Sequence, residues 1–288
     1  MKHVMTKENE NWFEEKIHTN YTQKILRQKN LFRGKSDFQE LEVFLSELFG
    51  KVLLLDGAIQ VTENDEFFYH EIFAHIPLNS FGPVKNVLII GGGDGCLLRE
   101  TLKHTGVSTT VVEIDAAVVE VVKKYIPELP SGAFDDTRAK IVVGDGLKFV
   151  DTTTEKFDVI LIDSTDPDNI SDNLFTTKFL VAARDLLTEN GILVMQSGTP
   201  FLQSDVFKNA KVSFKSVFDC SGFFYATIPT YSGGQHAFAW GSRKDISKIS
   251  IEAIKEVVQR NKYLTNCKHY NPAVHVAAFA ESTYLSRL

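Results

Sequence analysis

The stretch Val87-Leu88-Ile89-Ile90-Gly91-Gly92-Gly93-Asp94-Gly95 decides the fold of this chain. An apolar, largely β-branched run that ends in glycines and is followed by Leu97-Leu98-Arg99-Glu100 predicts a strand, a tight turn and the start of a helix. Such a turn, at the carboxyl end of a parallel strand, is where open α/β sheets bind nucleotides. The glycines let a ligand approach the backbone closely, but the carboxylate of Asp94 would repel a pyrophosphate. We therefore expect a ligand that is cationic or rich in hydroxyl and amino groups.

The composition is typical of a globular protein with one large domain, with or without a small companion. The chain of 288 residues is 43% hydrophobic, which is ample for a sizeable core. The net charge of −6 disfavours nucleic acid as a partner and suits a cationic ligand. Cys96, Cys220 and Cys267 have no paired spacing, so we predict no metal site and a reducing compartment. The sequence has no stretch of membrane-spanning length and no signal-peptide core, so we expect no membrane partner and a cytoplasmic location.

The glycine turn does not match the dinucleotide-binding fingerprint, because Cys96 stands where that pattern requires its third glycine. Upstream of it, residues 21 to about 62 contain short apolar patches separated by turn signals, and Asp56-Gly57 is typical of a type I′ hairpin. This region predicts a small antiparallel sheet, whose edges a second copy of the chain is expected to cover. Residues 63–75 have helical spacing, and we expect Pro77 to end that helix.

Strands and helices alternate from residue 84 onward. Near-continuous apolar strands between amphipathic helices indicate a parallel sheet that is covered on both faces. The segments 223–228 and 236–241 flank a turn and predict an antiparallel hairpin that closes the sheet. The other predicted strands are 84–90, 109–114, 140–143, 157–162 and 192–196, and the predicted helices are 97–104, 116–125, 176–187 and 204–218.

Acidic residues follow the predicted parallel strands. Glu113 ends the strand after the glycine turn, where a carboxylate can hold both ribose hydroxyls of a nucleoside; the alternative is a solvated charge. Asp115 is better explained as the N-cap of the next helix. Asp145-Gly146 is by itself an ordinary turn, but its carboxylate can accept a hydrogen bond from an adenine amine. Asp163 and Asp166 follow the next strand. Since the carboxyl ends of parallel strands share one edge, the series predicts a nucleoside-binding pocket with negative charge.

Taken together, these motifs resemble those of the polyamine aminopropyltransferase family, and of its bacterial spermidine synthases in particular. The resemblance implies an N-terminal β-strand domain, residues 1–68, that takes part in oligomerisation and in the substrate site. It also implies a Rossmann-like, methyltransferase-type catalytic domain, residues 69–288. The matching motifs are Leu54-Leu55-Asp56-Gly57, residues 62–71, residues 91–95, Val112-Glu113-Ile114-Asp115, Asp145-Gly146, residues 163–167, residues 228–234 and Tyr270-Asn271-Pro272.

The resemblance implies transfer of the aminopropyl group of decarboxylated S-adenosylmethionine to putrescine. The products would be spermidine and 5′-methylthioadenosine, and the donor is a co-substrate, so no cofactor is expected. This donor has lost its carboxylate and keeps an amine, so Asp94 can pair with its ammonium and repel intact S-adenosylmethionine.

The resemblance also assigns Asp163 as the base that takes a proton from the acceptor amine, and Asp166 as a residue that helps hold the acceptor. An amine with a pKa of about 10.4 is neutral in less than ~0.1% of molecules at pH 7. A carboxylate can serve as its base only if the sulfonium and an apolar wall lower the pKa of the amine in the complex.

Further site residues are implied by the resemblance. Gln39 is implied to bind the nucleoside of the donor and product, together with Glu113, Asp145 and Gly146. Four other residues are implied to line the acceptor site, namely Tyr69, His70, Gln196 and Tyr231. From their own surroundings, Gln39 would be a strand-surface residue, His70 a helix-face residue and Tyr231 a turn residue.

The chain departs from the family pattern after Pro167. Family members carry a Gly-Pro-rich segment there, whereas this chain has Asp168-Asn169-Ile170-Ser171-Asp172. Ile170 is expected to take over the contact with adenine. Ser232 replaces a second tyrosine, and both changes leave the length of the acceptor open.

Three alternatives remain. Cadaverine or spermidine can replace putrescine as the acceptor. A small-molecule methyltransferase can use the same scaffold, although Asp94 and the pair Asp163 and Asp166 argue against it. A polyamine- or nucleoside-binding module without catalysis would lack a base, and Asp163 is a candidate base. The expected partners are putrescine and decarboxylated S-adenosylmethionine, and the expected assembly is a homodimer or homotetramer.

Overall fold

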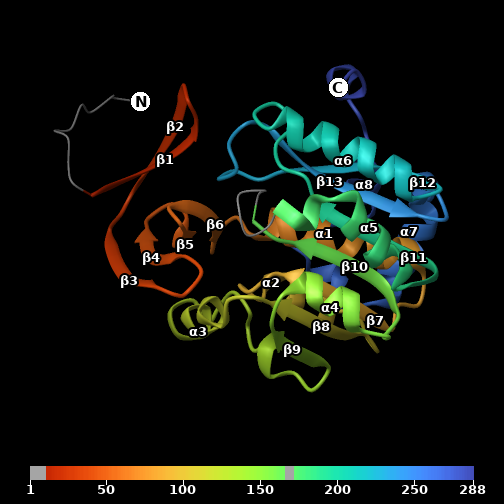
Figure 1. Cartoon of the computed structure of the whole chain (residues 1–288), viewed down its shortest axis with the longest axis horizontal. Coiled ribbons are helices and arrows are strands. Elements are labelled where there is room, and N and C mark those ends of the chain that lie inside the picture. The colour runs from red at the N-terminus through yellow and green to blue at the C-terminus, as the bar shows by residue number, and fades with distance from the viewer. Residues whose placement is uncertain (1–10, 166–171) are drawn as a thin grey trace.

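The computed structural model describes residues 11–165 and 172–288, so two predicted site residues, Asp166 and Ile170, lie outside the described residues. The described chain forms two parts that lie side by side, a small group of N-terminal strands and a larger α/β unit (Figure 1). The predicted fold class, an α/β sheet domain preceded by a small antiparallel β domain, is confirmed.

The N-terminal strands form a four-stranded antiparallel sheet and a separate hairpin. The sheet has the order β3 (Lys29–Lys35), β4 (Glu40–Ser46), β5 (Gly50–Leu55) and β6 (Ala58–Thr62). Asp56 and Gly57, between β5 and β6, have φ angles of 47° and 77°, as the predicted type I′ turn requires.

The hairpin pairs β1 (Trp12–His18) with β2 (Tyr21–Leu26) and projects from the small sheet, and Gln23 of β2 contacts the larger unit at Thr230 (Figure 1). Strand β1 is absent from the predicted elements, because after Phe13 only Ile17 interrupts its run of polar residues.

The larger unit is built on a seven-stranded sheet, counted over the described residues, with the order β12-β13-β11-β10-β7-β8-β9. Strands β7 to β11 are parallel, and β12 and β13 form the predicted antiparallel hairpin at one edge. Strand β7, which leads into the glycine turn, pairs with both β10 and β8 in the middle of the sheet. The strands are β7 (Asn86–Gly91), β8 (Ser108–Glu113), β9 (Ala139–Val143), β10 (Phe157–Asp163), β11 (Leu187–Gln196), β12 (Cys220–Thr227) and β13 (Gln235–Ser242).

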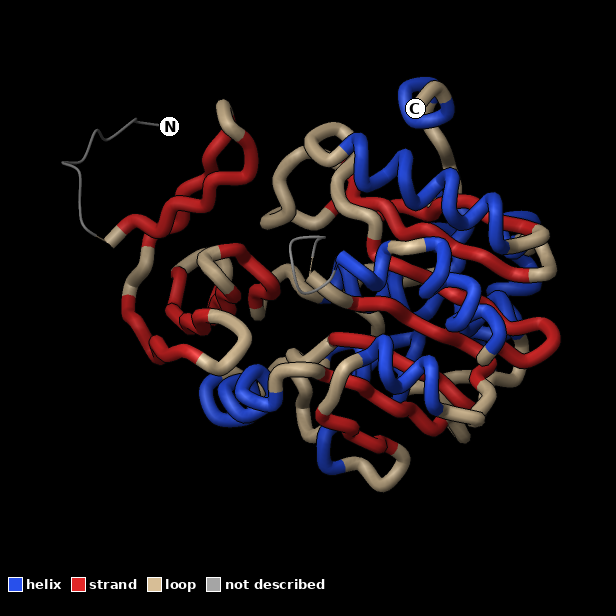
Figure 2. The backbone as a smooth tube through the Cα atoms, in the orientation of Figure 1, coloured by secondary structure: helices blue, strands red, loops and turns tan. Residues whose placement is uncertain are grey.

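Helices cover both faces of this sheet (Figure 2). The four helices predicted after the glycine turn are present, and their ends differ from the predicted ones by at most two residues. Helix α4 and the C-terminal helices α7 to α9 are absent from the prediction. The helices are α1 (Phe67–Phe81), α2 (Cys96–Leu102), α3 (Ala116–Tyr125), α4 (Gly146–Thr152), α5 (Thr177–Asp185), α6 (Ser204–Val217), α7 (Ile251–Arg260), α8 (Pro272–Ala277) and α9 (Thr283–Ser286).

Helix α1 begins at Phe67 and continues through Pro77, so the prediction that this proline ends the helix is wrong. Proline lacks the N–H group that would bond the carbonyl of Phe73, and it normally disrupts a helix interior. In α1 every residue from 69 to 79 is buried. Packing around the whole helix therefore stabilises it and outweighs the missing hydrogen bond.

Apolar cores fix the two parts against each other. One core joins α1 and α2 to one face of the large sheet, and a second joins α5 and α6 to the other face. A third core packs Leu41 and Val43 of β4 against Val118 and Val122 of α3 and against Cys96 at the start of α2. The small sheet is therefore held beside the carboxyl edge of the large sheet, where the glycine turn lies.

Candidate active site

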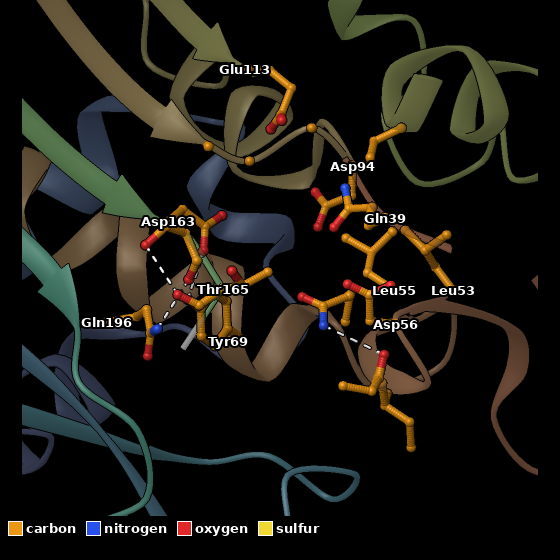
Figure 3. A pocket seen from close by; sticks show the side chains of 18 of the residues that line it. Gln39, Leu53, Leu55, Asp56, Tyr69, Asp94, Glu113, Asp163, Thr165 and Gln196 are labelled. Atoms are coloured by element: carbon orange, nitrogen blue, oxygen red, sulfur yellow. Dashed lines mark hydrogen bonds between the residues drawn. The ribbon is translucent and has the colours of Figure 1, made fainter. Parts of the chain in front are cut away.

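A cavity of about 630 Å³ lies between the small sheet and the carboxyl edge of the large sheet (Figure 3). The view places Asp163, Thr165 and Gln196 on one side and Gln39 on the other. All the predicted site residues that the structure describes line this cavity, namely Gln39, Tyr69, His70, Asp94, Glu113, Asp145, Gly146, Asp163, Gln196 and Tyr231.

The glycine turn packs directly on the end of strand β10. Gly91 has a φ of 83°, and a Cβ atom at this position would lie 2.0 Å from the carbonyl oxygen of Asp163. The N–H of Gly92 donates to the same carbonyl at 3.0 Å. A Cβ atom at Gly93 would lie 2.8 Å from a carboxylate oxygen of Glu113. These positions therefore need glycine because of the close approach of neighbouring strands.

Asp94 lies at the tip of the turn, where the backbone and a histidine hold its carboxylate. Oδ1 accepts a hydrogen bond from the N–H of Cys96 at 2.7 Å, at the start of α2. Oδ2 lies 3.7 Å from Nε2 of His70, whose side chain is only 3% exposed. His70 is therefore a buried residue of helix α1 whose imidazole lies in the cavity wall.

His70 lies between two carboxylates. Its Nδ1 is 3.0 Å from Oε2 of Glu66, and the guanidinium of Arg99 donates to both oxygens of Glu66 at 2.9 and 2.8 Å. Burial disfavours the charged imidazole, but Asp94 and Glu66 outweigh burial and raise the pKa of His70 to about 9. His70 therefore carries a positive charge at neutral pH, and Arg99, Glu66, His70 and Asp94 alternate in sign.

Asp163, at the end of β10, accepts a hydrogen bond from the hydroxyl of Tyr69 at 2.7 Å. Burial and the nearby Asp94 raise the pKa of Asp163 to about 6, against the opposing effects of His70 and Tyr69. Burial and the charge of Asp163 raise the pKa of Tyr69 above its usual value, so Tyr69 remains a hydrogen-bond donor. At neutral pH, Asp163 is therefore an ionised carboxylate with an unusually high affinity for a proton.

Glu113 is buried at the end of β8, so the alternative of a solvated charge is wrong. Its Oε1 accepts a hydrogen bond from the N–H of Asp115 at 2.9 Å. Burial is the main cause that raises the pKa of Glu113 to about 7, although hydrogen bonds from the backbone act in the opposite direction. This carboxylate therefore changes its charge near neutral pH.

Asp115 has the predicted N-cap role, because its Oδ1 accepts a hydrogen bond from the N–H of Ala117 at 3.0 Å. Its other oxygen accepts from Nε2 of Gln39 at 2.9 Å and from the hydroxyl of Ser36 at 2.7 Å. The hydrogen bond to Asp115 holds Gln39, in the turn between β3 and β4, at the start of α3, and Gln39 lines the cavity.

Asp145 is the N-cap of α4 and accepts a hydrogen bond from the N–H of Leu147 at 2.8 Å. A Cβ atom at Gly146 would lie 2.6 Å from a methyl carbon of Ile90. The sequence indicates only an ordinary turn at Asp145-Gly146, whereas in the structure Asp145 caps α4 and Gly146 allows the close contact with Ile90. Both residues also line the cavity.

The opposite end of the cavity is formed by segments far apart in the sequence. Gln196 is buried; its Nε2 donates to the carbonyl of Ser164 at 3.0 Å and its Oε1 accepts from the N–H of Gly198 at 3.0 Å. The hydroxyl of Tyr231 donates to the carbonyl of Gln60, and its ring lies 5.8 Å from that of Tyr69.

Several residues at this end are absent from the sequence-based prediction. Glu15, in the projecting hairpin, lines the cavity, and Asp65 accepts hydrogen bonds from the N–H and hydroxyl of Thr230 at 2.9 and 2.7 Å. His236 lies against Tyr69, and its buried Nε2 has no hydrogen-bond partner among the described residues. An acid between Phe13 and Ile17 on one face of a strand is the one signal in the sequence that points to Glu15.

Two groups of side chains in the described part of the chain are close enough together to ligate a metal ion, and both include a cysteine. They are Glu66, His70 and Cys96, and His75, Glu100 and Cys267. In both groups the carboxylate is already bonded by cationic side chains, with Arg99 on Glu66 and with Arg99 and Lys103 on Glu100. A metal ion would therefore compete with fixed positive charges.

Within the described ranges, no helix is long and apolar enough to cross a membrane.

The chain matches two family models that together cover most of its length. Residues 66–252 match the spermine/spermidine synthase domain, and residues 11–63 match the spermidine synthase tetramerisation domain.

Curated relatives and solved structures agree with these matches. The chain is 43% identical to the polyamine aminopropyltransferase of Serratia proteamaculans over 276 residues, covering 95% of both chains. It is 44% identical to that of Pseudomonas syringae pv. tomato over 275 residues, covering 95% of this chain and 96% of the relative.

Two solved structures are similar over the whole chain. A spermidine synthase in complex with the transition state analogue AdoDATO has a TM-score of 0.89 at 34% identity, covering 100% of this chain and 97% of the relative. The spermidine synthase of Thermotoga maritima has a TM-score of 0.88 at 33% identity, covering 100% and 96%. The carboxylate-lined cavity, the family models and the relatives therefore agree that the chain belongs to the spermine/spermidine synthase family, the polyamine aminopropyltransferases, which are transferases.

Proposed function

We propose that this protein transfers the aminopropyl group of decarboxylated S-adenosylmethionine to putrescine and releases spermidine and 5′-methylthioadenosine. The strongest support is that Asp94 and the Tyr69–Asp163 pair line one cavity at the edge where the glycine turn lies. Carboxylates that share an enclosed space favour cationic ligands, and both the donor and the diamine are cations. The names of the relatives support the reaction class.

The donor is proposed to bind at the glycine-turn end. The carboxylate of Glu113 can accept hydrogen bonds from both ribose hydroxyls, and Gln39, Asp145 and Gly146 line the wall around the proposed nucleoside position. Ile170, outside the described residues, is proposed to contact the adenine.

Asp94 is proposed to pair with the ammonium of the aminopropyl group. The charged His70 already balances one carboxylate charge at this place. Intact S-adenosylmethionine would bring its own carboxylate close to Asp94, so this charge is proposed to select the decarboxylated donor.

Asp163 is proposed to take the proton from the attacking amine of putrescine. The nitrogen lone pair then forms a bond to the methylene carbon next to the sulfonium, and the electrons of the broken C–S bond remain on sulfur as a neutral thioether. The pKa of Asp163 is raised to about 6, which brings it closer to the pKa of the amine. The nearby sulfonium lowers the pKa of the amine and reduces the difference further. Tyr69 donates a hydrogen bond that orients the carboxylate.

The acceptor is proposed to lie between Asp163 and the end of the cavity formed by Gln196 and Tyr231, with Tyr69 and His70 along its side. Asp166, outside the described residues, is proposed to help hold it. Both substrates are consumed, and the proposed reaction uses no cofactor.

We further propose that residues 1–68 contribute to a homodimer or homotetramer and to the substrate site, while residues 69–288 form the catalytic domain. The match of residues 11–63 to a tetramerisation domain supports the first part, as do the exposed aromatic side chains of Trp12 and Tyr21 on the hairpin. The proposed place of action is the cytoplasm.

An acceptor panel tests the proposed function. Purified protein is incubated with decarboxylated donor and with putrescine, cadaverine or spermidine, and 5′-methylthioadenosine is measured. We expect the highest kcat/KM with putrescine, and no methylthioadenosine from intact S-adenosylmethionine. A preference for another amine would overturn putrescine as the acceptor. Formation of S-adenosylhomocysteine from the intact donor would overturn the reaction class.

A further inference from the structure

Gln23 connects the projecting hairpin to the acceptor end of the cavity. Its side-chain Nε2 donates to the carbonyl oxygen of Thr230 at 2.9 Å and to the carboxylate of Glu15. Its Oε1 accepts a hydrogen bond from the hydroxyl of Ser232 at 2.8 Å. One side chain of β2 therefore joins β1 to the loop at Thr230, which lies 207 residues after Gln23 in the sequence.

The orientation of this amide follows from its partners. The carboxylate of Glu15 and the carbonyl of Thr230 can only accept hydrogen bonds, so the amide nitrogen must face both of them. The hydroxyl of Ser232 then donates to the amide oxygen. Because each end of the amide meets a matching group, Gln23 acts as a bridge between two segments.

The first of these segments, β1, is anchored through Phe13 and Glu15 on its inner face. Phe13 packs on Phe44 with ring centroids 5.7 Å apart, and Glu15 and Ile17, on the same face, line the cavity. The oxygen of Glu15 that does not face Gln23 accepts from the N–H of Ile59 at 2.8 Å. The position of Glu15 in the cavity wall therefore depends on both β6 and Gln23.

The second segment is the loop 230–232. Asp65, a buried carboxylate before α1, holds Thr230 through two hydrogen bonds, and the hydroxyl of Tyr231 bonds the carbonyl of Gln60. Those contacts come from the small sheet and its junction with α1. Gln23 adds the contact from the hairpin, which the loop receives at Thr230 and Ser232.

We propose that Gln23 is a positioning residue that sets the shape of the acceptor end by holding Glu15 and loop 230–232 in a fixed relation. The proposal rests on the proposed function, which supplies the diamine that occupies this end. The glycine turn is held instead by the backbone of Asp163 in β10, and Glu113 is held by the N–H of Asp115, just after β8. A substitution at Gln23 should therefore weaken the binding of the acceptor and leave the binding of the donor almost unchanged.

The test compares Gln23→Ala, Gln23→Glu and Ser232→Ala with wild type. A matched control is Thr22→Ala, on the exposed face of the same strand. KM is measured for putrescine at saturating donor and for the donor at saturating putrescine, and light scattering reports the assembly.

For Gln23→Ala we expect the KM for putrescine to rise about tenfold or more, with the KM for the donor within about twofold of wild type. Gln23→Glu, which has the same shape, should be impaired at least as much, because its carboxylate would face Glu15 and a carbonyl that cannot donate. Ser232→Ala should show a smaller rise in the same direction, and it decides the question if Gln23→Ala does not fold. Thr22→Ala should match wild type.

The proposal is wrong if the putrescine KM stays within twofold in the folded variants, or if the two KM values rise together. A wild-type enzyme that uses no amine as acceptor would overturn the proposed function instead. The two failures are therefore distinguishable.

Discussion

The two ends of the cavity are built in different ways. At the end proposed to bind the nucleoside, the glycine turn, Glu113 and Asp145 lie at or just after the carboxyl ends of β7, β8 and β9, which are adjacent strands of one sheet. At the end proposed to bind the acceptor, the hairpin, Gln60 and loop 230–232 come from distant segments and are joined by hydrogen bonds. Backbone pairing therefore fixes the first end, whereas single side chains fix the second.

The largest expected effect is at Asp163, where the two ends meet. Asp163→Asn removes the proposed base but keeps the shape and can still accept a hydrogen bond from Tyr69. We expect kcat to fall by about 10²–10⁴-fold, while the Kd for 5′-methylthioadenosine stays within about twofold. Single-turnover kinetics and calorimetric titration measure the two quantities.

The control for this prediction is Asp151→Asn, the same loss of charge at an exposed position of α4. A turnover of Asp163→Asn near that of wild type would remove Asp163 as the base. A large loss of nucleoside affinity would instead show that the two ends are not independent.

A smaller effect is expected at Asp94. Asp94→Asn removes the charge that is proposed to hold the ammonium of the donor. It also removes the main interaction that raises the pKa of His70 and one that raises the pKa of Asp163. We expect kcat/KM for the decarboxylated donor to fall about 10–100-fold, and discrimination against intact S-adenosylmethionine to weaken. Competition between the two donors measures this, and unchanged discrimination would contradict the role of Asp94.

The smallest expected effect concerns the nucleoside end alone. The pKa of Glu113 is raised to about 7, so its carboxylate is mostly ionised at pH 8 and mostly protonated at pH 6. If the ionised form binds the ribose hydroxyls, the affinity for 5′-methylthioadenosine should fall about tenfold between pH 8 and pH 6. Fluorescence or calorimetric titration across this range measures the change.

Glu113→Gln is the control for this pH dependence. The variant should bind more weakly than wild type at pH 8 and show little change in affinity down to pH 6. A wild-type affinity that does not vary with pH would show that Glu113 does not bind the ribose as a carboxylate.

The same contrast between the two ends explains what the sequence predicts. An apolar run typical of a strand, followed by a glycine or an acidic residue, is a local pattern in the sequence. It places Asp94, Glu113 and Asp163 at one edge of the sheet without any knowledge of distant contacts. Glu15 lines the cavity, and Asp65 holds Thr230 in its wall, only because the hairpin and the start of α1 pack against other segments of the chain. No local pattern carries that information.

Pro77 and His70 show the limit of local patterns within a single helix. The rule that proline ends a helix fails in α1 because burial on all sides stabilises it, and burial depends on elements that come later in the chain. The charge of His70 depends on Glu66, one turn before it, and on Asp94, in another loop. The sequence motif predicts that His70 belongs to the site, but its protonation state depends on carboxylates that only the folded chain brings close to it.

The contact between Gly91 and Asp163 has a consequence for how such an enzyme can diverge. The two residues are partners in the sheet, and a Cβ atom at position 91 would lie 2.0 Å from the backbone carbonyl of Asp163. Any side chain there must displace the strand that carries the proposed base. Natural variation is therefore expected to leave this pair intact, and a lineage that acquires a new acceptor would do so by exchanging residues in the hairpin and in loop 230–232. With the proposed acceptor site, we expect the choice of amine to change in evolution separately from the reaction at Asp163.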